Sequence, residues 1–328
     1  MHSIRKSSFI IFIVGITLIL LAGLKPIGID RDSFNYVNMI RDSIKFEDLY
    51  LREPAFNVIQ IFNGLAFDKS TTTFFLIFAI LGVTLKIIAI LRSSLYPILS
   101  LIIYICFYYI LHDLTQIRVG VASALFLLAI NDRVKDRKTN SLIKVFAATC
   151  FHYSAVLAFV IFIVNKNKLN KMLYLMLPIV GIMAALILNA NVLSYAAQYL
   201  PNFLSSKINA YLTIQKNDAL NQINVFNFYY STLFVIYCSV IVFIGDNINA
   251  RDILYVKLLG LGLFCFYAMA FIPVMAFRFS EFYCIVIIIL FANLASYFKQ
   301  PYIYKACIVT FGLGYFITQG LMHNINFS

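Results

Sequence analysis

Apolar runs close to 20 residues long recur along the chain and constrain its fold more than any other feature. Of the 328 residues, 62% are hydrophobic and 12% are charged, whereas a soluble domain has about 25% charged residues. A bilayer core accepts helices of about 20 apolar residues, in which every backbone polar group is bonded internally. The sequence therefore predicts an all-α, polytopic integral membrane protein with about nine to ten transmembrane helices.

The predicted helices and their connections use the whole sequence, so we expect residues 1–328 to form a single polytopic membrane domain. The helices are expected at about 8–24, 71–91, 95–111, a stretch ending near 130, 172–189, 227–245, 253–271, 282–298 and 306–322. Two polar segments, 25–70 and 190–226, are expected on the periplasmic side. Within the first, the short apolar run 54–67 is too brief to span a bilayer.

Residues 141–164, SLIKVFAATCFHYSAVLAFVIFIV, carry polar side chains at their midpoint, around His152. One interpretation is a straight transmembrane helix. The other is a broken or re-entrant helical hairpin with His152 at its tip. The hairpin keeps the basic segments 165–171 and 299–305 on the cytoplasmic side, as the positive-inside rule favours, whereas a straight helix places both outside. We therefore expect the hairpin.

Charge and cysteine content exclude several classes of protein. The net charge of +12 is typical of cytoplasmic loops that obey the positive-inside rule, so no nucleic-acid partner is expected. The six cysteines lie at wide spacing in apolar segments without a CxxC pair, which indicates neither a disulfide framework nor a metal site. The sequence has no P-loop, GxSxG, HExxH or DxD motif. No metal ion or cofactor is expected.

Two arginines stand apart from the basic clusters and adjoin apolar helices. Arg118 opens the helix that ends near residue 130, and Arg278 lies at a predicted helix junction. A charge in such a position is costly unless it meets an acidic group. The planar guanidinium suits phosphate oxygens because it donates two parallel hydrogen bonds. Alternatively, each arginine is structural and pairs with an acid such as Asp113 or Glu281.

One histidine and three carboxylates are candidate proton acceptors. His152 lies at the midpoint of 141–164, and Asp30, Asp32 and Glu53 lie in the first outer segment. Either type of group can take a proton from a hydroxyl in a transition state. Alternatively, His152 is a structural residue whose hydrogen bonds are satisfied at a helix break, and Asp30 and Asp32 are solvated loop acids.

Five short segments, in this order and spacing, resemble those of a known family. They are GIDRDSFNY at 28–36, REPAFNVI at 52–59, LTQIRVGVASALFLLAI at 114–130, AATCFHYSAVLAF at 147–159 and FRFSEFY at 277–283. Together they resemble the EpsG family of multi-pass polysaccharide polymerases, which are related in role to the Wzy O-antigen and capsule polymerases of bacteria. The resemblance covers roughly residues 8–298.

The resemblance implies a metal-independent membrane glycosyltransferase in the bacterial inner membrane. It would transfer a glycan from undecaprenyl diphosphate to a sugar hydroxyl of a new lipid-linked repeat unit at the periplasmic face, building O-antigen, capsule or exopolysaccharide. Arg118 and Arg278 are expected to bind the diphosphate. His152 or a carboxylate is expected to position or deprotonate the hydroxyl. Arg31 stands where the family has a small residue, so both Asp30 and Asp32 stay candidates beside Glu53.

The expected partners are the lipid-linked glycans and the bilayer, and a chain-length regulator stays open. Two other functions share the predicted helices and charges. A flippase or transporter of lipid-linked oligosaccharide often has inverted repeats and paired broken helices, whereas this sequence has one expected break and no detectable repeat. An O-antigen ligase would use the same donors but transfer the glycan to a lipid A core.

Overall fold

The computed structural model is all-helical, as the sequence predicts. It describes residues 2–42, 52–187, 190–199, 205–206, 208–209, 213, 223–321 and 325. These residues contain no strand, and their one isolated β-bridge joins Asp30 to Ile325. The chain forms two compact units, one of residues 1–164 with 287–328 and one of residues 165–286. The predicted outer segments 25–70 and 190–226 lie partly outside the described residues.

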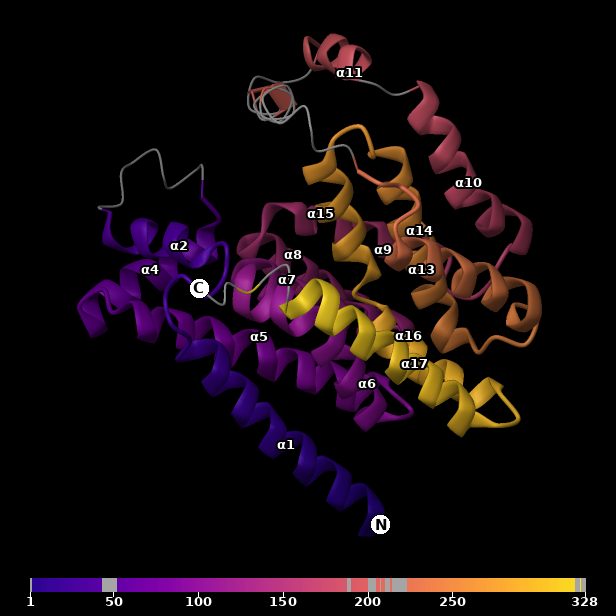
Figure 1. The fold of residues 1–328 in the computed structure, drawn as a ribbon, viewed down its shortest axis with the longest axis horizontal. Helices are drawn as coiled ribbons and strands as arrows, with labels where there is room; N and C mark the ends of the chain where they lie inside the picture. Colours follow the sequence, from indigo (N-terminus) through magenta and orange to yellow (C-terminus); the bar gives the residue numbers. More distant parts are fainter. Residues whose placement is uncertain are drawn as a thin grey trace. The chain divides into compact units, whose positions relative to one another are not determined.

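The first unit is built around α5 (Thr71–Ser93), which packs against α1 (His2–Gly23) and α7 (Ile117–Val134) (Figure 1). α5 begins after Ser70, whose hydroxyl accepts a hydrogen bond from the backbone N–H of Thr73 at 3.3 Å. Such a side-chain cap satisfies one of the amide groups that the first turn leaves open. The apolar run expected at 71–91 thus starts at a defined cap.

α6 (Pro97–Tyr104) continues directly into a π-helix, η1 (Ile105–Thr115). A π-helix of eleven residues is unusual, because such segments are mostly single turns, frequently at functional sites. The C-terminal elements of this unit pack against α6 and η1. They are α16 (Ile287–Leu294), α17 (Pro301–Tyr315) and η5 (Phe316–Leu321), and the short η4 (Ala295–Tyr297) joins α16 to α17.

An aromatic cluster joins α5 to two short helices, α2 (Ser33–Arg41) and α4 (Pro54–Phe67). The bounds of α4 match the short apolar run at 54–67. The ring centre of Phe56 lies 5.3 Å from that of Phe74 in an edge-to-face arrangement and 6.2 Å from that of Tyr36. These three side chains are buried, so the cluster fixes both short helices on α5.

The stretch centred on His152 is broken into three pieces. α8 (Lys138–Phe151) ends at His152, whose backbone is extended with φ −154° and ψ 121°. A 3₁₀ helix, η2 (Tyr153–Phe159), follows and leads into the single turn of α9 (Val160–Ile163). The chain is therefore not one straight helix over 141–164.

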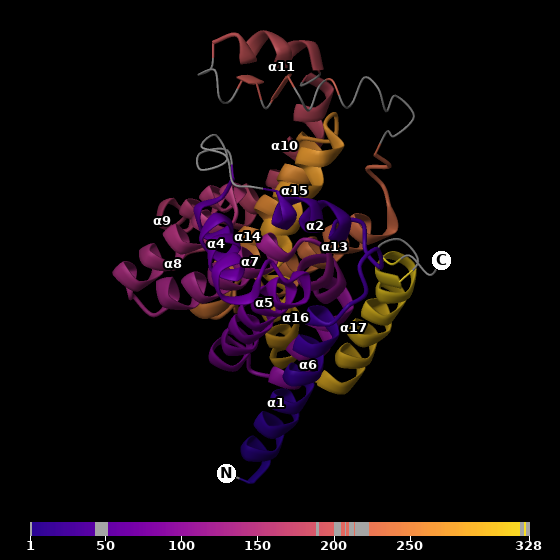
Figure 2. The same cartoon turned by 90° about the vertical axis from the view of Figure 1, so that its left-hand side faces the viewer.

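Contacts with α7 show that the chain doubles back at this break. At the start of α8, Ser141 Oγ donates to the carbonyl oxygen of Ala129 at 2.8 Å. In α9, the carbonyl oxygen of Ile161 accepts from Arg133 Nε at 3.2 Å. Both ends of the stretch therefore lie at the C-terminal end of α7. Figure 2 shows α8 and α9 beside α7. That the tip at His152 enters a membrane stays a prediction.

The second unit is centred on α14 (Ala250–Ala268), which contacts its other main helices. These are α10 (Lys171–Ile187), α13 (Phe228–Ser239) with its π-helical extension η3 (Val240–Ile244), and α15 (Pro273–Cys284). A further helix, α11 (Ala190–Ala197), follows α10. On α14, the buried Lys257 donates to the carbonyl oxygen of Asn165 at 2.5 Å and to that of Lys168. Tyr230 stacks on Phe266 with ring centres 3.5 Å apart.

The structure leaves open the number of transmembrane helices that the sequence predicts. Among the described residues, two helices, Thr71–Ser93 and Pro97–Thr115, are long and apolar enough to cross a membrane, or three if the pair 273–284 and 287–297 is one broken span. The expected nine to ten helices are therefore not confirmed. Several of the remaining apolar runs form shorter apolar helices of 10–17 residues in the described part of the chain, among them Lys171–Ala185 and Phe228–Ile244.

We expect Phe56→Ala to destabilise the first unit by about 3–5 kcal/mol, the usual cost of truncating a buried phenylalanine. The side chain is 0% exposed and holds α4 against α5. Thermal unfolding of the purified protein in detergent measures the effect. Phe62→Ala is the matched control, because Phe62 lies on the same helix but is 53% exposed. Equal losses of stability in the two variants would contradict this account.

Candidate functional site

The carboxylate of Glu53 binds two side chains from distant parts of the chain. Arg118 Nη1 donates to Glu53 Oε2 at 2.5 Å, and His152 Nδ1 lies 3.1 Å from Glu53 Oε1. The side chains of Glu53 and His152 are 7% and 15% exposed, and that of Arg118 is 23% exposed. One buried carboxylate thus holds a guanidinium and an imidazole, each of which is partly accessible.

Each of these residues lies at a helix end, where the backbone departs from helical geometry. Glu53 precedes Pro54, the first residue of α4, and is extended with φ −62° and ψ 135°, as residues before proline usually are. Arg118 lies in the first turn of α7, just after Gln116, which has φ −93° and ψ 61°. His152 ends α8. The three breaks bring the side chains together.

Aromatic side chains and the hairpin tip complete the surroundings. The guanidinium carbon of Arg118 lies 5.5 Å from the ring centre of Tyr36 and 5.2 Å from that of Phe56, within the range of cation–π attraction. The hydroxyl of Tyr153 donates to the carbonyl oxygen of Arg52 at 2.8 Å. The tip of the hairpin is therefore fixed to the residue that precedes Glu53.

The environment of Glu53 keeps its carboxyl ionised. Burial alone would raise the pKa, but the hydrogen bond with His152 and the charge of Arg118 outweigh it and lower the pKa of Glu53 to about 2. An ionised carboxylate only accepts hydrogen bonds, so Nδ1 of His152 carries a proton and its N–H donates a hydrogen bond to Glu53. In the neutral imidazole, Nε2 is then left as an acceptor.

Asp30 is engaged with Lys25 and with the start of α2. Its Oδ2 accepts from Lys25 Nζ at 2.7 Å, and its Oδ1 accepts from the backbone N–H groups of Asp32 and Ser33, both at 3.0 Å. The Asp30 side chain is 0% exposed. Asp32 is the residue before α2 and is half-buried. The structure thus gives Asp30 a structural environment, and a catalytic role for either aspartate stays a prediction.

Arg278 lies on α15 in the second unit, where it is exposed and one turn ahead of Glu281. Of the residues predicted to bind the substrate or act on it, the structure brings Arg118 and His152 together through Glu53. The place of Arg278 beside them stays a prediction.

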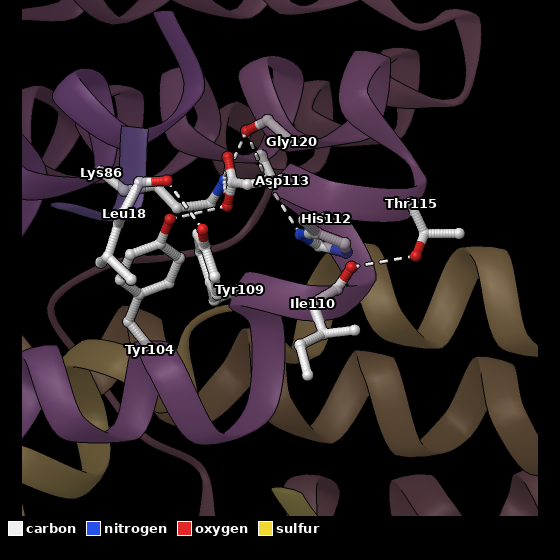
Figure 3. Close-up of polar contacts among 10 residues, drawn as sticks. Leu18, Lys86, Tyr104, Tyr109, Ile110, His112, Asp113, Thr115 and Gly120 are labelled. Atoms are coloured by element: carbon white, nitrogen blue, oxygen red, sulfur yellow. Dashed lines mark hydrogen bonds and ion pairs between the residues drawn. The ribbon is translucent and has the colours of Figure 1, made fainter. Parts of the chain in front are cut away.

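Lys86 is the principal residue that the sequence analysis missed. Its ammonium group lies 2.9 Å from each carboxylate oxygen of Asp113, with both side chains buried (Figure 3). The suggested pairing of Asp113 with Arg118 is therefore wrong, because Lys86 binds Asp113 and Glu53 binds Arg118. A lone charge inside an apolar run was the signal that singled out Arg118, and the same signal applied to residues 71–93 identifies Lys86.

The described residues contain no cluster of ligands for a metal ion. No three His, Cys, Asp or Glu side chains converge within them, and the cysteines are free thiols. At this site, the group suited to an anionic ligand is the guanidinium of Arg118, whose N–H groups are all donors.

We expect the stabilisation by Glu53 to depend on pH. Its folded-state pKa is about 2, against about 4.3 in an unfolded chain. The ionised carboxylate therefore stabilises the fold above about pH 4.3, and this contribution, on the order of 3 kcal/mol, is lost as the pH falls through about 2. The difference in stability between wild type and Glu53→Gln should therefore become smaller as the pH is lowered from about 6 to about 3.

Thermal unfolding in detergent at several pH values measures this difference. Asp68→Asn is the matched control, because Asp68 is an exposed carboxyl at the other end of α4. The stability of Asp68→Asn should stay close to that of wild type at every pH. A difference between wild type and Glu53→Gln that does not change with pH would contradict the ionised state of Glu53.

A family comparison covers the whole site. The model of the EpsG family matches residues 8–327, a range that contains Glu53, Arg118 and His152 as well as Arg278. No curated protein and no solved structure matches the chain. Because the match spans nearly the whole chain, the protein belongs to the EpsG family, the Wzy-like polysaccharide polymerases.

Proposed function

We propose that the protein polymerises oligosaccharide repeat units carried on undecaprenyl diphosphate, at the periplasmic face of the bacterial inner membrane. The products would be O-antigen, capsule or exopolysaccharide. A general role in polysaccharide polymerisation follows from membership of the EpsG family. The observation that carries the detailed proposal is the carboxylate of Glu53, which holds the guanidinium of Arg118 and the imidazole of His152 at one place.

The proposed reaction needs a base and a stabilised leaving group. The acceptor sugar hydroxyl attacks the anomeric carbon of the donor glycan, and the bond from that carbon to the diphosphate oxygen breaks. The hydroxyl proton passes to Nε2 of His152, while Glu53 holds the imidazole through Nδ1. The proton then leaves with the released lipid diphosphate, so that atoms and charge balance.

Arg118 is suited to the charge that develops on the leaving diphosphate. Its contact with Glu53 uses Nη1, and a guanidinium carries five N–H donors. The side chain can therefore keep Glu53 as a partner while other donors bind phosphate oxygens, and such charge-assisted bonds are strong. Arg278 is proposed as a second diphosphate ligand on the sequence argument alone, as an arginine apart from the basic clusters.

The carboxylates take different roles in this proposal. Glu53 orients His152, whereas Asp30 fixes the start of α2 because Lys25 and backbone N–H groups occupy its oxygens. Asp32 follows Asp30 in the outer segment and is proposed to orient the acceptor sugar.

We expect Arg118→Ala and Arg278→Ala to abolish polymer while single-repeat glycolipid remains, because the leaving diphosphate loses its cations. The glycolipid profile of a deletion strain that carries each variant, at matched protein levels, measures this. Arg92→Ala is the control, because Arg92 is exposed at the far end of α5 and should support normal polymer. Wild-type polymer length in the two test variants would refute their assignment.

The same deletion strain separates the competing functions. Single repeats on the core indicate a lost polymerase. Undecorated core with polymer accumulated on the carrier indicates a lost ligase. Repeat units trapped on the cytoplasmic side indicate a lost flippase.

We expect His152→Ala to slow polymerisation by about 10²–10⁴-fold, the range for loss of a general base. Added imidazole should restore part of the rate in isolated membranes supplied with lipid-linked repeat units, because it can replace the missing proton acceptor. Arg118→Ala membranes are the control and should show no rescue. A His152→Ala variant that imidazole leaves unchanged would argue for an orienting role instead of a base.

A further inference from the structure

The first turn of α7, which carries Arg118, begins at a sharp corner of the backbone. The π-helix η1 ends at Thr115, Gln116 leaves the helical region, and α7 begins at Ile117. The direction in which the Arg118 side chain leaves α7 therefore depends on the contacts that hold this corner.

Lys86 on α5 holds the α7 side of the corner. Its ammonium group donates to both carboxylate oxygens of Asp113 at 2.9 Å and to the carbonyl oxygen of Gly120 at 2.8 Å (Figure 3). Asp113 Oδ2 also accepts from the hydroxyl of Tyr104 at 2.7 Å. The side chains of Lys86 and Asp113 are 0% and 1% exposed, so solvent does not reach the pair.

Lys25 holds the η1 side of the same corner. Its ammonium group donates to Asp30 Oδ2 at 2.7 Å and to the carbonyl oxygen of Leu114, and it lies 4.4 Å from the ring centre of Phe75. Two buried ammonium groups, each neutralised by an aspartate, therefore bind carbonyl oxygens on either side of Arg118 in the sequence.

Close packing leaves the corner little freedom to shift. A Cβ atom added to Gly120 would lie 2.6 Å from the carbonyl oxygen of His112, and one added to Gly82 would lie 2.4 Å from Asp113 Oδ1. Nδ1 of His112 also lies 3.1 Å from Ser123 Oγ, which links η1 to α7. Glycine at both positions is what lets α5, η1 and α7 approach so closely.

Stability alone does not account for the Lys86–Asp113 pair. Removing two charges from water is costly, and well-packed apolar residues often replace a buried ion pair without loss of stability. An apolar pair would fill the same space, but it would remove the ammonium hydrogen bond to the carbonyl oxygen of Gly120, which otherwise accepts from the hydroxyl of Ser123 at 3.1 Å. The pair therefore supplies a directional contact to the turn that carries Arg118.

We propose that Lys86 and Asp113 are positioning residues that fix the guanidinium of Arg118 at the diphosphate site, through the carbonyl oxygen of Gly120. Neither residue contacts the substrate. The inference rests on the proposed diphosphate-binding role of Arg118. It assigns a functional purpose to the buried network on α5, η1 and α7.

The test is the affinity of the purified full chain in lipid nanodiscs for undecaprenyl diphosphate. Arg118→Ala should weaken binding by ~10-fold or more, as expected for the loss of charge-assisted hydrogen bonds. The double variant Lys86→Met/Asp113→Asn, which leaves no unpaired charge, should also weaken binding. Adding this pair of changes to Arg118→Ala should weaken binding no further, because the pair acts through Arg118.

The matched control is Asp132→Asn/Lys144→Met. This ion pair lies at the opposite end of α7, and its removal should leave the affinity within about 2-fold of wild type. Gly120→Ala is a second test variant that keeps every charge, because its Cβ would push the first turn of α7 away from His112. Gly120→Ala should weaken binding of undecaprenyl diphosphate. If the double variant does not fold, this variant tests the inference alone.

Two results would overturn the inference and leave the proposed function intact. One is wild-type affinity in both the folded double variant and Gly120→Ala. The other is that Lys86→Met/Asp113→Asn weakens binding by the same factor in the wild-type protein and in Arg118→Ala. Unchanged binding in Arg118→Ala would instead reject the diphosphate role of that residue, and with it both proposals.

Discussion

A carboxylate buried among apolar side chains must find partners for both oxygens, and Glu53 finds them in Arg118 and His152. This requirement ties together the start of α4, the first turn of α7 and the break after α8, which are far apart in the chain. The contact is also reciprocal. Without Glu53, a partly buried guanidinium would lose its counter-charge, and the imidazole would lose the acceptor that fixes its tautomer. The architecture of the first unit and its proposed chemistry therefore share one interaction.

The same constraint explains where the buried lysines lie. Lys25 donates to the carbonyl oxygen of Leu114 at the end of η1, and Lys257 donates to carbonyl oxygens in the segment before α10. Carbonyl groups at the C-terminal ends of helices lack an intrahelical donor, and apolar surroundings offer no water to replace it. An ammonium group on a flexible stem supplies that donor, so these two lysines permit breaks that would otherwise be costly. Lys86 instead binds Asp113 and adds a donor to the carbonyl oxygen of Gly120 in α7.

The sequence predicts the parts of this structure that depend on local pattern. Apolar length gives the bounds of α4, and a polar group inside an apolar run marks the break at His152. The isolation of Arg118 from the basic clusters marks it as a candidate site residue. Other features depend on contacts between distant residues. The helix 33–41 lies in a polar segment without an apolar run, the π-helix has no sequence period that distinguishes it, and the partner of Asp113 became evident only from the packing of α5 against η1.

The ion pair between Arg118 and Glu53 has a consequence for competition by bulk lipid. In the proposed function, the carrier diphosphate competes for Arg118 with the phosphate headgroups of the surrounding lipid. A guanidinium already neutralised by a carboxylate exerts little long-range attraction on such headgroups. A ligand with two linked phosphates brings more charge and more acceptor oxygens to the remaining N–H groups. In the proposed function, the resting ion pair would thus favour a diphosphate over the singly charged headgroups around it.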